Sequence, residues 1–114
     1  MSKSKGYNIV ERLRAANERP FITIEEGKTY SVNTSKTTAL HLEAVNQDDK
    51  LSSVDKLDKI IEIGLGKKAF DEISEMDLSI EAIVLLVEAI TAALSGEELE
   101  EVKERFQETE KSKG

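Results

Sequence analysis

The stretch from Ile80 to Leu94 constrains the fold more than any other part of this sequence, because it places apolar residues on most sides of a helix. These residues are Ile80, Ile83, Val84, Leu85, Leu86, Val87, Ile90 and Leu94. A helix at the surface of a domain carries an apolar stripe on one side only. The segment therefore predicts a helix at the centre of a bundle, or one that is partly an oligomer contact. It is shorter than the roughly 20 residues that a bilayer requires and contains Glu81 and Glu88, so we expect no membrane partner.

The length and composition of the chain limit the number of domains and the classes of function that it can have. A chain of 114 residues has room for one core, so we expect a single domain over residues 1–114, with flexible tails at 1–6 and 108–114. The chain has no Cys and one His, which excludes thiolate metal sites, cysteine nucleophiles and two-histidine motifs. A net charge of -7 and few aromatic residues argue against a nucleic-acid partner. No leader segment is recognisable, which predicts a cytoplasmic protein.

Pro20 divides a short N-terminal segment from a predicted hairpin. The runs 21–24 and 29–32 are rich in β-branched and aromatic residues and are joined by a turn that contains Gly27, as in an antiparallel hairpin. Residues 7–18 are open to two interpretations, because Ile9 and Val10 suit either an amphipathic helix or a strand.

Serine residues mark the expected helix starts downstream. A cap is expected within Asn33–Ser35 and at Ser52 and Ser79, and Ser95 with Glu98 forms a capping-box pattern before the last helix. Gly64 is expected at the C-terminal cap of the helix that begins after Ser52. A short helix is predicted over 67–75. The fold class is therefore α+β, mostly α: an N-terminal β-hairpin followed by a small bundle of four to five helices.

The patterns that resemble catalytic or ligand sites fail on their context. The run from Gly64 to Ala69 matches a dinucleotide-binding pattern, but the residues before it have helical periodicity, where that motif needs a strand. Reading the 67–75 helix as a DNA-recognition helix would place three carboxylates against phosphates. His41 has no carboxylate on its own helix face, and neither Asp48–Asp49 nor the glutamates of 97–104 have calcium-loop spacing. We therefore expect no catalytic residue, cofactor or metal.

Charge is distributed unevenly along the chain. Residues 1–19 contain five basic and two acidic residues, a net charge of +3, whereas the last helix is strongly acidic. Opposite charges at the two ends favour steering between subunits or toward a partner, although a solvated surface is the commoner explanation.

Three runs in the second half of the chain, 51–69, 75–79 and 89–98, share a pattern with one known family, and a similar stretch lies at 28–36. On these runs the chain resembles the tail assembly chaperones of phages and prophages of Gram-positive bacteria, over roughly residues 20–107. The resemblance implies a small, acidic, non-enzymatic protein of the host cytoplasm. Such a protein would bind the tape measure protein, keep it soluble, and help tail tube subunits assemble around it. The alternative is a minor structural protein of the virion, in the tail or connector.

A chaperone for a long helical client needs an apolar strip surrounded by charge. The residues expected to form this partner-binding strip are Ile83, Val87, Ile90, Leu94, Leu99 and Phe106. The alternative is that the same side chains close the core of the monomer. Homo-oligomerisation is left open by the sequence.

Overall fold

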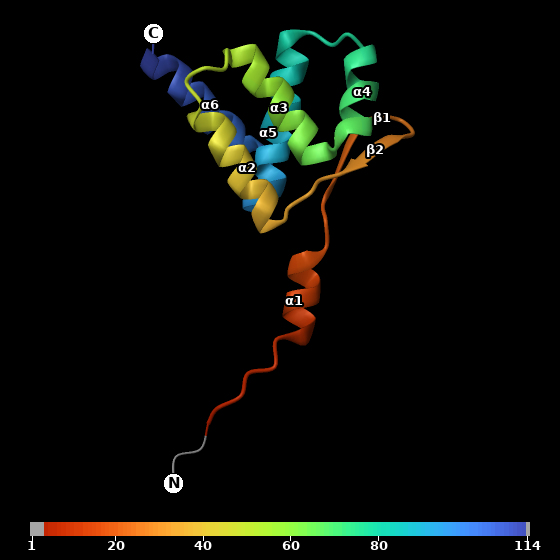
Figure 1. The fold of residues 1–114 in the computed structure, drawn as a ribbon, viewed down its shortest axis with the longest axis vertical. Coiled ribbons are helices and arrows are strands. Elements are labelled where there is room, and N and C mark those ends of the chain that lie inside the picture. The colour runs from red at the N-terminus through yellow and green to blue at the C-terminus, as the bar shows by residue number, and fades with distance from the viewer. Residues whose placement is uncertain (1–3, 114) are drawn as a thin grey trace.

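Five helices surround a shared apolar core, and a β-hairpin lies against one end of it, in the computed structural model of this chain (Figure 1). The structure describes residues 4–113, with side chains from residue 4 to residue 107. Within these residues the elements are α1 (Val10–Asn17), β1 (Phe21–Glu25), β2 (Lys28–Ser31), α2 (Lys36–Gln47), α3 (Ser53–Leu65), α4 (Lys67–Glu75), α5 (Ile80–Ser95) and α6 (Leu99–Lys113). The fold is α+β and mostly α, and the hairpin is followed by five helices, as the sequence predicts.

Three serine caps begin the helices of the bundle. The Oγ atoms of Ser35, Ser52 and Ser79 each accept a hydrogen bond from the backbone N–H three residues further on, at 3.1–3.2 Å. Each bond satisfies one of the donors that the first turn of a helix leaves without an intrahelical partner. The predicted starts of α2, α3 and α5 are therefore confirmed.

The prediction that Gly64 caps the end of α3 is wrong. The helix ends at Leu65, and the capping residue is Gly66, with a φ of +97°. Gly64 lies inside the helix and is buried against Ile90 of α5. Its lack of a side chain allows two helices to approach each other, which a local reading of the sequence mistakes for a turn signal.

The capping box expected at Ser95 is also absent. Ser95 is the last residue of α5, and Gly96, with a left-handed φ of +75°, ends that helix. The Oγ of Ser95 lies 3.4 Å from the backbone N–H of Glu97, and α6 begins only at Leu99. Helix α5 continues through Ser95 itself, and the left-handed Gly96 ends it.

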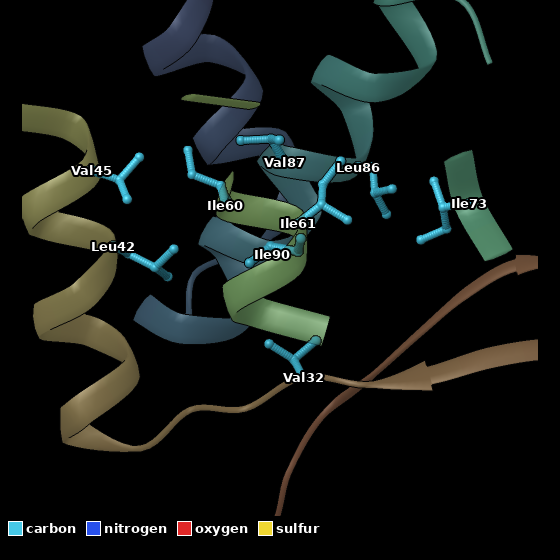
Figure 2. Close-up of a cluster of buried hydrophobic side chains, with 9 residues drawn as sticks. All are labelled: Val32, Leu42, Val45, Ile60, Ile61, Ile73, Leu86, Val87 and Ile90. Atoms are coloured by element: carbon cyan, nitrogen blue, oxygen red, sulfur yellow. The ribbon is translucent and has the colours of Figure 1, made fainter. Parts of the chain in front are cut away.

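The buried core cluster takes three residues from α5, two each from α2 and α3, and one each from α4 and the segment after β2 (Figure 2). Ile61 of α3 and Ile90 of α5 lie at its centre, with relative exposures of 1% and 0%. Leu42 and Val45 close it from α2, and Ile73 closes it from α4. Helix α5 contacts α3, α6 and β1, so the expectation that this apolar segment is central to the bundle is confirmed.

The hairpin is tied to the bundle by backbone hydrogen bonds and by one buried side chain. Its strands are antiparallel, and at its base the N–H of Val32 donates to the carbonyl of Pro20 at 2.9 Å. The next N–H, that of Asn33, donates to the carbonyl of Gly64 at 2.8 Å, while the Val32 side chain is fully buried. Ile22 and Ile24 pack against the core from β1.

Residues 4–19 form an arm that extends away from the bundle (Figure 1). Every one of them is exposed, and α1 has no buried residue. The arm accounts for much of the 64 Å length of the molecule, against 37 and 27 Å across it. Of the two interpretations left open for residues 7–18, the helix is the one observed.

The two expected tails differ in their backbone. Residues 4–6 have no regular secondary structure, whereas residues 108–113 continue α6. Residues 1–3 and 114, which also belong to these tails, lie outside the described residues.

Candidate interaction site

An apolar groove of about 560 Å³ runs between strand β1 and helix α5. One wall is Pro20 and the first four residues of β1, and the other is a single face of α5. Hydrophobic and alanine side chains make up most of both walls, which suits an apolar side chain or an amphipathic helix as the occupant. We refer to it as the β1–α5 groove.

Alanines in α5 create the hollow. Ala82, Ala89 and Ala93 all line the groove, at spacings of seven and four residues that place them on one face of the helix. Their short side chains leave space where leucine or isoleucine would fill the gap between α5 and β1. Strand β1 lies opposite this face, and Leu86 and Ile22 line the groove where it meets the core.

The rim of the groove carries large apolar side chains that are open to solvent. Phe21 of β1 is 72% exposed and Leu85 of α5 is 42% exposed, and both line the groove. Partly buried Leu99 lies at its α6 end. Exposed aromatic and aliphatic side chains around a hollow are typical of a surface that binds another chain.

A bidentate ion pair between Arg105 and Glu97 lies at the α6 end of the groove. The Nη1 and Nη2 atoms of Arg105 donate to the two carboxylate oxygens of Glu97 at 2.8 and 3.0 Å. Hydrogen bonding from Arg105, and then from Ser95, lowers the pKa of Glu97 below its usual value. The pairing holds the start of α6 beside the groove and keeps one carboxylate charged at its rim.

A second, larger hollow of about 870 Å³ lies between β2 and α4 but has a different character. It is lined by charged side chains of both signs, among them Lys28, Lys68 and Glu75. At its edge the phenol of Tyr30 donates to Oε2 of Glu72 at 2.8 Å, and this hydrogen bond raises the pKa of Tyr30. The exposed charges favour solvent as its occupant, so the β1–α5 groove is the stronger candidate.

The six residues of the predicted partner-binding strip do not form one accessible surface. Val87 and Ile90 are core residues, with exposures of 2% and 0%, and present no surface to a partner. The others are partly buried: Ile83, Leu94 and Phe106 pack against the core, and Leu99 lines the β1–α5 groove. For Val87 and Ile90 the alternative interpretation, closure of the monomer's own core, is therefore the observed one.

The remaining patterns of the sequence are not brought together into a site. The run from Gly64 to Ala69 is the junction of α3 and α4, with a helix on both sides. His41 is exposed on α2. Among the described residues no group of three His, Cys, Asp or Glu is close enough to hold a metal ion. Within the same part of the chain, none of the helices has the length and apolarity needed to span a membrane.

Sequence reasoning missed the β1–α5 groove and the exposed Phe21 on its rim. The alanine spacing within α5 was a usable signal, because alanines on one face of an otherwise leucine- and isoleucine-rich helix mark a place where the surface is hollow. The position of β1 opposite that face depends on contacts between distant parts of the chain, which local patterns do not contain.

Comparisons with models of protein families, with curated proteins and with solved structures find no match to this chain.

Proposed function

We propose that this protein is a non-enzymatic phage or prophage tail assembly chaperone. It binds the tape measure protein in the host cytoplasm and promotes assembly of the tail tube around it. The observation that carries the proposal is the β1–α5 groove, an apolar hollow with exposed Phe21 and Leu85 on its rim, in a chain with a net charge of -7. The resemblance to tail assembly chaperones supplies the identity of the client.

The groove suits one amphipathic segment of a long helical client. Its alanine floor allows a helix backbone to come close, and its apolar rim contacts the same segment from both sides. The excess acid elsewhere on the chain keeps a complex with such a client soluble. A tape measure protein offers many such segments, so several chaperone copies would cover one client.

The test is co-expression with the tape measure protein encoded by the same phage or prophage. We expect the client to move from the insoluble to the soluble fraction and to co-purify with the chaperone. Leu85→Asp, at the rim of the groove, should reduce co-purification at least about tenfold, because it replaces an apolar contact with a charge. Leu40→Asp is the matched control, since Leu40 is 54% exposed on α2 and does not line the groove.

Two results would contradict the proposal. A client that stays insoluble beside the wild-type protein, with no complex formed, removes the chaperone function. Mass spectrometry that finds this protein in mature particles at a fixed copy number indicates a minor structural protein of the tail or connector instead.

A further inference from the structure

The N-terminal arm, residues 4–19, carries an apolar stripe that stays exposed among the residues whose side chains the structure describes. Ile9, Val10 and Leu13 are 53–56% exposed, and Tyr7 is 81% exposed. Apolar residues occur at positions 9, 10, 13 and 16, which is helical spacing. These four side chains, three from α1 and one from its N-cap residue Ile9, therefore lie on one face of the helix. Helix α1 has eight residues and none of them is buried, so packing against the bundle adds little to its stability, and such short helices are marginal in water. An arm of this kind is stabilised when its apolar face is covered.

We propose that the arm of one copy docks into the β1–α5 groove of a second copy. The groove has the features that the stripe needs: an alanine floor at Ala82, Ala89 and Ala93, and apolar rim residues on both sides. Placing Leu13 over the alanine floor covers apolar surface on both partners. The contact is a helix-in-groove interaction between two copies of the same chain.

Charge favours this pairing over a neutral partner. The first 19 residues carry +3 and the whole chain carries -7, so residues 20–114 carry -10. The acidic excess reaches the α6 end of the groove, where exposed Glu98 and Glu100 flank Leu99, while Glu97 is already paired with Arg105. Arg12 and Arg14 lie at the two edges of the apolar stripe, because residues two apart in a helix point in nearly opposite directions. Burying the stripe in the groove therefore brings basic side chains to its margins, toward these carboxylates.

The connection between arm and bundle directs the arm to another copy. Glu18 has an extended backbone, with φ -65° and ψ 130°, and Arg19 precedes Pro20, which restricts it to extended conformations. Pro20 is itself part of the groove wall, and its carbonyl is bonded to the N–H of Val32. Folding back into its own groove would need a chain reversal within these two extended residues. The arm therefore points outward (Figure 1).

Sedimentation equilibrium of the full chain tests whether the copies associate. We expect a concentration-dependent dimer or larger ring, and we expect Leu13→Asp to raise the dissociation constant by about tenfold or more. Leu40→Asp should leave it unchanged, since both leucines are 54% exposed but Leu40 lies on α2, away from the groove. The proposal is overturned if the wild-type chain is a monomer up to about 1 mM, or if Leu13→Asp associates as the wild type does.

Cross-linking locates the contact and distinguishes an arm that docks into a second copy from an arm that folds back into the groove of its own chain. The chain has no natural Cys, so each introduced thiol is unique. A Leu13→Cys chain mixed with a tagged Ala89→Cys chain should give a disulfide-linked heterodimer under mild oxidation, whereas Leu40→Cys with Ala89→Cys should not. Absence of the first heterodimer, or its appearance at the level of the Leu40→Cys control, overturns the proposal. So does a chain carrying both Leu13→Cys and Ala89→Cys that closes on itself as a monomer.

This inference concerns the protein alone and does not depend on the tape measure protein being its client. If the cross-link does not form but the client complex is soluble, only the docking of the arm into a second copy is rejected. A heterodimer without any client complex would reject the proposed function only.

Discussion

Gly64 of α3 and Ile90 of α5 lie so close that a β-carbon on residue 64 would be 2.9 Å from Cγ2 of Ile90. Carbon atoms in favourable contact are about 3.5–4.0 Å apart. Ile90 is fully buried and branched at Cβ, so it has little freedom to move its methyl group aside. The glycine therefore sets how closely the two central helices of the bundle pack.

Gly64→Ala should lower the free energy of unfolding by about 1–2 kcal/mol, measured by urea denaturation. Overpacking of a core costs roughly 1–3 kcal/mol, and the better helix propensity of alanine returns up to about 1 kcal/mol. Ile90→Leu removes Cγ2 at nearly constant volume and supplies the control background. The explanation fails if Gly64→Ala costs as much with Leu at position 90 as with Ile.

Ser79→Ala should destabilise the protein by about 1 kcal/mol, because it removes the 3.1 Å hydrogen bond to the N–H of Ala82 at the start of α5. Ser53→Ala is the comparison, since Ser53 is exposed in the first turn of α3 and is not its cap. Thermal unfolding of both variants measures the difference. A shift in melting temperature as large for Ser53→Ala as for Ser79→Ala would argue against the cap.

Stability should depend on pH through Glu97 in the acid range. Its pKa in the folded protein lies below the usual value of 4.5 because Arg105 donates hydrogen bonds to it. The stabilisation is therefore complete above pH 4.5 and is lost as pH falls through the lower, folded-state pKa. The stability gap between wild type and Glu97→Gln should be constant near neutral pH and should shrink below pH 4.5. A constant gap down to pH 2 would contradict this assignment.

Leu13→Asp should leave the melting temperature of the dilute, monomeric protein unchanged within about 1 °C. The arm has no buried residue, so a substitution on it removes no contact of the bundle. Calorimetry at low protein concentration makes the comparison, with circular dichroism to confirm that the helix content is retained. A large fall in melting temperature would mean that the arm contributes to the stability of its own bundle.

A client that binds the β1–α5 groove should compete with the arm. If both proposals hold, adding a soluble segment of the tape measure protein should reduce the yield of the Leu13→Cys–Ala89→Cys heterodimer in proportion to groove occupancy. A scrambled segment of the same composition is the control. An unchanged yield at saturating client would place the client elsewhere on the surface.

Signals that act within one turn were predicted well from the sequence. Ser35, Ser52 and Ser79 cap helices because a side-chain oxygen and an N–H three residues away meet in any helix start. The bounds of α4 agree with the helix predicted over 67–75. The hairpin follows from two β-branched runs around Gly27, which has a positive φ of 82°.

Residues whose role depends on contacts with distant parts of the chain were assigned the wrong role from the sequence. Gly64 looks like a cap in the sequence, and only the position of Ile90 reveals it as a close helix contact. Val87 and Ile90 belong to the core because α3 covers that side of α5, while the face with Ala89 is left to the hairpin. Local periodicity gives the width of an apolar surface but not which part of it another element covers.

The hydrogen bond that joins Val32 to Pro20 gives the arm a mechanical connection to the rest of the molecule. The arm leaves the bundle at Pro20, Val32 is anchored in the core, and Asn33 is bonded to the last turn of α3. Because Pro20 and Val32 lie at the same end of the antiparallel hairpin, tension on the arm would load their hydrogen bond first and then unzip β1 from β2, while the hydrogen bond from Asn33 to Gly64 holds the end of β2 to α3. A protein held by its arm would open at the hairpin first, and this would deform one wall of the β1–α5 groove while the helices stayed packed.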